Sequence, residues 1–464
     1  MDRPFPIPPA SERAIGIEFY LSRTPGVPGR SKASDEDFRV REISTYPRPD
    51  PVGAYTVLRV ESRGWEQHEL AAAIARRLGL PSRSVQWSGT KDRRAVAERL
   101  LSYRGAPPAA GLDLPGVVLL EAYRARDGLV LGHHYGNSFE IRITGLGAPP
   151  AESVRAYRAT EAELRAAGGF PNFFGPQRFG EVRPVTHAVG RAIVRADVDG
   201  AVDLYLTARP TGGSTGTGDA ARAEYATHRD AGRALREFPP EYRFERALLE
   251  RLAGGDSAAR ALRALPHELR RLFVHAYQAY LFNRWLGLRR AAGLSLDRPE
   301  AGDSILRLGR DGTVRSQDGI EVGEDNATEC ADLVRRGGAL LAGPLVGSET
   351  HVPKGRGGEL LAGLLAEEGV EPGMFVLPAA PELASRGAWR PVLLPVPPLG
   401  VSEEADAVLF RFSLPKGAYA TILLREFLKN GASCRGRVPP KTSADEPTNT
   451  REPARTLALR YGDR

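Results

Sequence analysis

The chain has 464 residues, of which 42% are hydrophobic and 26% are charged, with 64 lysines and arginines against 57 aspartates and glutamates. This composition excludes a chain that is disordered throughout and leaves room for about two to three domains. The net charge of +7 favours an acidic partner, nucleic acid first.

The N-terminal part of the chain predicts β-strands around one helix. The helix is expected over 66–81, because its apolar residues recur at helical spacing and Gly79 and Pro81 end it. Stretches that alternate in polarity or are rich in β-branched residues predict strands at 14–21, 37–43, 54–62 and 137–146.

Beyond residue 150 the apolar spacing becomes helical. Helices are predicted over 152–167, 185–206, 218–237, 243–253 and 267–293. The last one contains LRRLFVHAYQAYLFNRWLGL, whose aromatic side chains are expected in a core rather than on a base-stacking platform. The segment 209–220, RPTGGSTGTGDA, has the composition of a flexible loop.

A second β-like region begins near residue 388. WRPVLLPV and DAVLFRFSLP predict strands, and AYATILLREFLKN predicts a helix ended by Asn430 and Gly431. Residues 431–464 are mostly polar and are expected to be disordered or weakly docked. This order suggests one α/β domain that is interrupted by a helical insertion, although the sequence alone does not join the two β regions.

The chain lacks the common signatures of cofactors and membranes. The two cysteines, Cys330 and Cys434, are far apart, so neither a zinc site nor a disulfide is expected. His133 and His134 have no metal partner at ligand spacing, and no glycine pattern for nucleotide binding occurs. No apolar stretch has the length of a signal peptide or a membrane span. We therefore expect a cytoplasmic protein without cofactor, metal or obligate protein partner.

Residues 89–95 read GTKDRRA and place one carboxylate, Asp92, among three cations. Charged turns are common, and taken alone this heptapeptide is better explained as a solvated turn. The alternative is a carboxylate that is held ionised beside a polyanionic substrate.

Six ordered motifs resemble those of the TruD family of pseudouridine synthases. GTKDRRA fills every fixed place of the family's Gly-x-Lys-Asp-x-x-Ala. The other five are KASDEDFRVRE (32–42), GNSFEIRI (136–143), PNFFGPQRFG (171–180), AYQAYLFNRWL (276–286) and LPKGAYATILLREF (414–427). Phe173 and Tyr419 depart from the usual residue in some members, but both keep an aromatic ring.

The resemblance implies a fold and a reaction. The fold is an α/β (α+β) pseudouridine synthase catalytic domain with a mixed sheet, formed by 1–170 and 388–430. A mainly helical TruD-specific domain is inserted over 171–387, and a tail follows over 431–464. The reaction is the isomerisation of a uridine in RNA to pseudouridine, with uridine 13 of tRNA as the usual substrate, and it requires no cofactor.

The resemblance also assigns the reactive residues. Asp92 is the implied nucleophile, and a nearby cation would keep it ionised. Lys32 is the preferred pairing cation, because Lys91 adjoins Asp92 and can face a phosphate of the substrate instead. Without the resemblance, Lys32 would be read as a solvated loop lysine. Whether Asp92 attacks C1′ of the sugar or removes a sugar proton to give a glycal stays open.

Three further positions are implied to contact the target nucleotide. Phe38 and Tyr419 match aromatic residues that stack on the extruded base, and Asn137 matches an asparagine whose amide can bind a uracil edge. The structural alternatives are strand core for Phe38 and a turn residue for Asn137. Two other functions compete: an RNA-binding protein without catalysis, and an aspartate-dependent nucleoside hydrolase.

Overall fold

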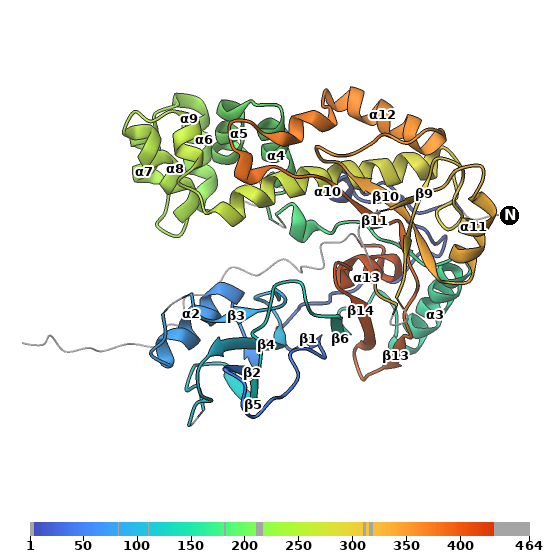
Figure 1. The fold of residues 1–464 in the computed structure, drawn as a ribbon, viewed down its shortest axis with the longest axis horizontal. Helices are drawn as coiled ribbons and strands as arrows, with labels where there is room; N and C mark the ends of the chain where they lie inside the picture. Colours follow the sequence, from blue (N-terminus) through green and yellow to red (C-terminus); the bar gives the residue numbers. More distant parts are fainter. Residues whose placement is uncertain are drawn as a thin grey trace, which may run out of the picture.

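The computed structural model describes residues 4–430, except 82, 110, 181, 210–216, 310–311 and 315–318. Figure 1 shows a β-sheet region below and a mostly helical region above, through which the long helix α10 (His267–Ala291) runs. The predicted disordered tail and Cys434 lie outside the described residues. So does most of the predicted loop 209–220, whose last four residues begin a helix.

The larger sheet has eight strands in the order β13-β14-β6-β1-β4-β2-β5, with β3 paired to β4. Only the β1–β4 pair in this sheet is parallel, so the mixed α/β fold expected from the sequence is confirmed. The strands are β1 (Phe38–Ile43), β2 (Tyr55–Arg63), β3 (Gln86–Trp87), β4 (Val96–Arg104), β5 (Val117–Ala125), β6 (Gly136–Ile143), β13 (Gly400–Glu403) and β14 (Val408–Pro415).

Strand β14 joins the two β regions that the sequence leaves apart. It pairs with β6 over its whole length, from Val408 opposite Ile143 to Pro415 opposite Gly136. The chain therefore returns to the first sheet after the helical region. Strands expected at 37–43, 54–62 and 137–146 are confirmed as β1, β2 and β6.

The strand expected over 14–21 is wrong. This segment is irregular although Ile15 and Ile17 are buried. Its backbone polar groups bind side chains instead of a neighbouring strand: the Asn283 amide donates to the Ile15 carbonyl at 2.9 Å, and the Leu21 N–H donates to Glu426 at 3.1 Å. Buried backbone groups are thus satisfied without a β-ladder.

The helices follow the predicted spacing but are more often interrupted. Predictions over 152–167, 243–253 and 267–293 are confirmed by α3, α8 and α10. The helices are α1 (Ala10–Arg13), α2 (Gln67–Arg77), α3 (Pro150–Ala166), α4 (Thr186–Val194), α5 (Val198–Thr207), α6 (Thr217–His228), α7 (Ala231–Glu237), α8 (Arg243–Ala253), α9 (Ala258–Leu262), α10, α11 (Ala327–Arg335), α12 (Arg356–Glu368) and α13 (Ala420–Leu428).

Two predicted helices each divide in two, where a residue adopts a positive φ and an aspartate caps the next helix. Ala196 has φ 59° before Asp197, which caps α5, and Arg229 has φ 54° before Asp230, which caps α7. The aspartate side chains accept hydrogen bonds from the first turns of these helices. Helix α13 ends at Leu428, and its C-cap, Lys429, has φ 53° and stands one residue before the predicted stop.

The region 171–387 also contains strands that the sequence does not predict. Strands β8 (Ser304–Arg307), β9 (Ile320–Glu321) and β10 (Ala339–Leu345) form a second sheet with β11 (Ala388–Pro391), in the order β11-β10-β8-β9. The start of the expected return strand thus pairs with β10, and the next short strand, β12 (Leu393–Leu394), pairs with β7 (Phe170–Pro171). The proposed domain boundaries stay a prediction.

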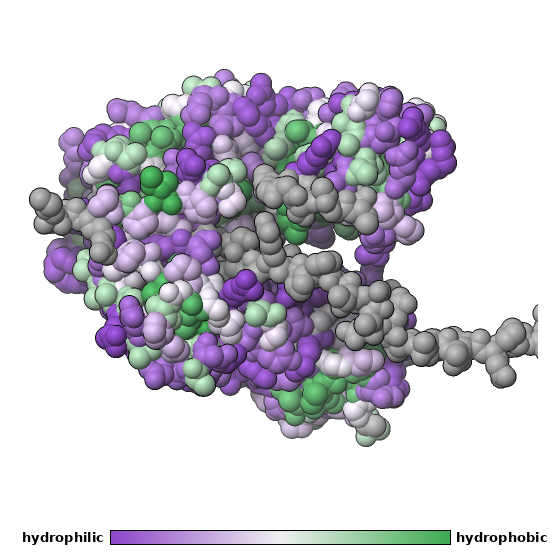
Figure 2. Space-filling model, turned by 180° about the vertical axis from the view of Figure 1, so that it is seen from behind, coloured by the Kyte–Doolittle hydropathy of each residue, from purple (hydrophilic) through white to green (hydrophobic). Residues whose placement is uncertain are grey.

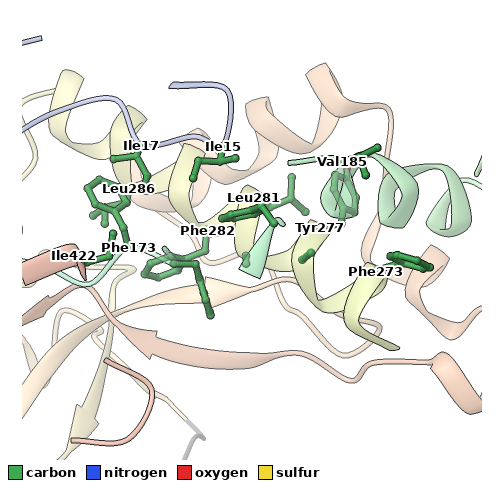
Figure 3. Packing of buried hydrophobic residues seen from close by; sticks show 14 of the residues in the cluster. Ile15, Ile17, Phe173, Val185, Phe273, Tyr277, Leu281, Phe282, Leu286 and Ile422 are labelled. Atoms are coloured by element: carbon green, nitrogen blue, oxygen red, sulfur yellow. The ribbon is translucent and has the colours of Figure 1, made fainter. Parts of the chain in front are cut away.

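Helix α10 lies at the centre of the largest core, which confirms the interpretation of its aromatic residues. Phe273, Tyr277, Phe282 and Trp285 are at most 3% exposed. Figure 3 shows buried side chains along α10, with Ile15 and Ile17 beside its C-terminal half. These four rings stabilise the protein interior and do not present a stacking platform, while Tyr280 is partly exposed and packs against the same core.

The visible face in Figure 2 is mostly hydrophilic, with small separate hydrophobic areas, and is hollowed between the helical part and the sheet part at the right. Among the described residues, no helix combines the length and the apolar character that crossing a membrane requires.

Candidate active site

Lys32 and Asp92 form the ion pair expected from the sequence. Their loops precede β1 and β4, and because these two strands run parallel, both loops lie at the same edge of the sheet. Lys32 Nζ is 2.5 Å from Asp92 Oδ2 and 4.2 Å from the ring centroid of Phe38. The lysine side chain is 9% exposed and the aspartate 41% exposed. The carboxylate is therefore held by a buried cation and remains open to a ligand.

Lys91 points to a different carboxylate. Its Nζ is 2.8 Å from Glu42 Oε2, and the two side chains are 2% and 1% exposed. Burial lowers the pKa of Lys91, while Glu42 opposes that shift. The sequence offers phosphate as a partner for Lys91; the structure pairs its charge inside the protein instead. A substrate contact by Lys91 stays a prediction.

Glu42 is a site residue to which the sequence reading assigns no role. It also accepts a hydrogen bond from the Ser88 hydroxyl, and the Ser88 carbonyl lies 3.0 Å from His134 Nδ1. A Cβ on Gly89 would stand 2.8 Å from Lys91 Nζ and 3.0 Å from His134 Cε1. A side chain at the first glycine of GTKDRRA would thus displace the groups of the Lys91–Glu42 pair and His134.

A cavity of about 380 Å³ opens beside Asp92, within the usual size of small-ligand pockets. Its floor is one face of the sheet, where Phe38 and Val40 of β1 lie beside Asn137 and Phe139 of β6. Its other wall comes from elements distant in sequence: Gln177 and Arg178, Leu272 of α10, and Gly417 to Thr421 around the start of α13.

The three residues expected to bind the target nucleotide all line this cavity. Phe38 is 4% exposed, so its ring also belongs to the core that the structural alternative predicts. Tyr419 is half-buried, precedes α13, and its ring centroid is 6.2 Å from that of Phe174. Asn137 Oδ1 is buried without a hydrogen-bond partner in the described residues. The cavity thus offers aromatic surfaces and a free amide oxygen.

Two cavity residues without a predicted role, Gln177 and Arg178, lie in the motif PNFFGPQRFG. Gln177 Nε2 donates to Thr421 Oγ1 at 3.3 Å. The buried Arg390 guanidinium donates to the Asn172 carbonyl and to the Gly417 carbonyl, both at 2.9 Å. Burial lowers the pKa of Arg390 to about 10. These bonds tie the motif to the turn that carries Tyr419, and the motif itself is the signal that could have found both residues.

A second cavity of about 640 Å³ shares Asp92 and Gln177 with the first. Lys32, Arg93, Arg94 and Arg183 also line it. Such a cationic surface suits a polyanion that passes over the carboxylate. In the described ranges, no group of three or more histidine, cysteine, aspartate or glutamate side chains is placed to hold a metal ion.

Comparisons with known proteins give one consistent result for the chain as a whole. The family model described as tRNA pseudouridine synthase D (TruD) matches residues 14–427. A Halobacterium salinarum protein named "Probable tRNA pseudouridine synthase D" is 39% identical over 432 residues, which cover 90% of this chain and 97% of the relative. A protein of the same name from Methanococcoides burtonii is 34% identical, with 91% and 98% covered.

A solved structure gives the same result for the fold. The crystal structure of a Methanosarcina mazei protein described as "Putative tRNA pseudouridine synthase D (TruD)" superposes with a TM-score of 0.77 at 32% identity. The match covers 92% of this chain and 99% of that protein. The similarity therefore extends over both the sheet region and the helical region.

Proposed function

This chain belongs to the tRNA pseudouridine synthase D (TruD) family, and we propose that it isomerises uridine 13 of tRNA to pseudouridine with Asp92 as the nucleophile. One observation carries the proposal: the partly exposed carboxylate of Asp92 lies at a cavity that also holds Phe38, Asn137 and Tyr419. The proposal also implies that the protein binds tRNA and acts in the cytoplasm.

In the proposed mechanism, the uridine leaves the RNA stack and enters the cavity. Tyr419 and Phe38 contact the base, and the free Asn137 amide oxygen accepts the uracil N3–H. Asp92 acts at the sugar, by attack on C1′ or by removal of a sugar proton, and Lys32 stabilises its negative charge. The bond between C1′ and N1 of uracil breaks, and a bond between C1′ and a ring carbon forms. That ring carbon then loses its proton, and N1 carries one in the product. No oxidant or reductant is consumed.

The direct test is to incubate the protein with a tRNA transcript, digest the RNA and quantify pseudouridine by mass spectrometry. The proposal predicts pseudouridine without added cofactor. An RNA-binding protein without catalysis would retain the transcript but leave its uridine unchanged. A nucleoside hydrolase would release free uracil from uridine and leave the transcript intact.

Truncation of Tyr419 to alanine should impair catalysis more than folding. The ring lies at the cavity and is only half-buried, and a stacking contact contributes about 1–3 kcal/mol. We expect kcat/KM to fall by about 5- to 150-fold, measured with tRNA under single-turnover conditions. Tyr419→Phe, which keeps the ring, is the control. A Tyr419→Ala protein that melts several degrees lower but has normal activity per folded molecule would assign Tyr419 to the core.

Binding of tRNA should weaken steeply with salt. The net charge is +7 and cations line the second cavity. If about four to six phosphates are contacted, the log–log slope of affinity against salt concentration should be about −3 to −5. A titration at several salt concentrations measures this slope, and a slope near zero would refute a dominant role for phosphate contacts.

A further inference from the structure

The cavity beside Asp92 contains one positive charge that the described residues do not balance. Lys91 is paired with Glu42 at 2.8 Å, and Asp92 is paired with Lys32 at 2.5 Å. Arg178 lines the same cavity, but its guanidinium makes no ion pair within the described part of the chain, and its Nε is buried without a hydrogen-bond partner there. A buried polar group without a partner is costly, so this arginine is suited to an anionic ligand.

The neighbours of Arg178 contact its side chain without forming an ion pair with it. The guanidinium carbon is 5.5 Å from the ring centroid of Phe174. Arg390, a buried cation, also lies against that ring, at 3.9 Å. His275 nearby has its pKa lowered to about 4 by burial and by the charges of Arg178 and Arg271, so it is neutral at pH 7. Two cations, Arg178 and Arg390, therefore lie against one ring.

The backbone position of Arg178 is also fixed. Its N–H donates to the Gly175 carbonyl at 3.0 Å within the short helix η1 (Pro176–Arg178). On one side, Gln177 is bonded to Thr421 of α13; on the other, the Thr186 hydroxyl donates to the Phe179 carbonyl at 2.7 Å. The backbone that carries Arg178 is thus anchored, which limits the positions that its guanidinium can reach when a ligand binds.

We propose that Arg178 binds a non-bridging oxygen of a phosphodiester next to the extruded uridine. This inference rests on the proposed function. The cavity presents two buried polar atoms that have no hydrogen-bond partner among the described residues, Asn137 Oδ1 on the sheet and Arg178 Nε on the opposite wall. A uridylate carries a complementary group for each: an imide N–H on the base and an anionic phosphate. Arg178 is thus a substrate-binding residue that sets how deeply the nucleotide enters the cavity. It belongs to the motif PNFFGPQRFG.

The test is a double-mutant cycle in which one change is made in the protein and the other in the tRNA. Arg178→Met is compared with the wild type on tRNA transcripts that carry a neutral methylphosphonate on the 5′ or the 3′ side of uridine 13. On the unmodified transcript, Arg178→Met should lower single-turnover kcat/KM by about 10- to 100-fold. At the contacted phosphate, the methylphosphonate should lower kcat/KM of the wild type by a similar factor. It should lower kcat/KM of the variant by less than about threefold. Losses that multiply at both positions would overturn the inference.

The controls separate this inference from the proposed function. Arg298→Met removes a charge from an 84% exposed arginine outside the cavity and should leave the cycle unchanged. Arg178→Gln replaces Arg178→Met if the latter melts below the wild type. The cycle is also measured as tRNA dissociation constants, which do not require conversion. A wild type that forms no pseudouridine would contradict the proposed function, whereas independent losses in binding would contradict only the Arg178 contact.

Discussion

Replacing Asp92 by asparagine should abolish pseudouridine formation, by more than about 10⁴-fold, and leave the affinity for tRNA nearly unchanged. Asparagine keeps the shape of the side chain and can still bind Lys32, which lies 2.5 Å away, but it has no charge with which to act as a nucleophile. Glu42 cannot replace it, because that carboxylate is buried against Lys91. Removal of one negative charge should, if anything, slightly favour polyanion binding.

The measurement is the single-turnover yield of pseudouridine, together with a binding titration and a melting curve. Asp35→Asn is a matched control, because Asp35 lies in the loop of Lys32 and its carboxylate faces Arg94 at 3.9 Å. If Asp92→Asn gave a near-normal yield, GTKDRRA would be the solvated turn that the heptapeptide alone suggests. Loss of yield with normal binding and melting would place the chemistry on Asp92.

Replacing Glu42 by glutamine should lower the free energy of unfolding at pH 7 by about 3–5 kcal/mol, because it leaves the Lys91 ammonium buried without its counter-charge. The pair is almost completely buried, so solvent does not screen this loss. Urea unfolding of the wild type and the variant measures it. The double variant Glu42→Gln/Lys91→Met removes both charges and should recover most of the stability. A single variant as stable as the wild type would contradict this account of the pair.

The same variant should gain stability as the pH rises. Burial lowers the pKa of Lys91 and Glu42 opposes the shift, so loss of Glu42 lowers that pKa further. The folded variant then releases the proton at a lower pH than the unfolded chain, in which a lysine titrates near about 10.4. Its free energy of unfolding should therefore rise between the folded-state pKa of Lys91 and about pH 10. Comparison of the two proteins at pH 7 and pH 9.5 checks this direction.

The sequence predicts the strands that bury one face and expose the other. Strand β1 alternates between buried and exposed residues along FRVREI, and β6 is similar. Strand β4 has no such alternation, because it lies between β1 and β2 and is buried on both faces. In β5 the pattern is hidden by apolar residues that face solvent, such as Val118 at 55% exposure. The second sheet has strands of two to seven residues, and β10 contains a proline.

The site residues, too, were only partly predicted from the sequence. The Lys32–Asp92 pair was predicted as a pair, and Phe38, Asn137 and Tyr419 all line one cavity. Glu42 was given no role, although the alternation of β1 places it on the buried face with Phe38 and Val40. A carboxylate on such a face needs a buried partner, and that requirement points to a lysine.

Other parts of the site lie beyond any local pattern. Arg178, which precedes helix α4, lines the same cavity as Asp92, and Thr421 reaches that cavity only after the chain has returned to the sheet, about 240 residues further along. Periodicity reports which residues share one helix or one strand. It does not report which distant loops form opposite walls of a cavity, so the motif alone marked this segment.

The most direct test of the account is to map pseudouridine along a tRNA transcript that has been treated with the wild-type protein. Each position is read by chemical labelling of pseudouridine and primer extension, and Asp92→Asn serves as the parallel control. The account predicts one modified position, uridine 13, with the wild type and none with the variant. An unmodified transcript that the wild-type protein nevertheless binds tightly would contradict it and leave RNA binding without catalysis.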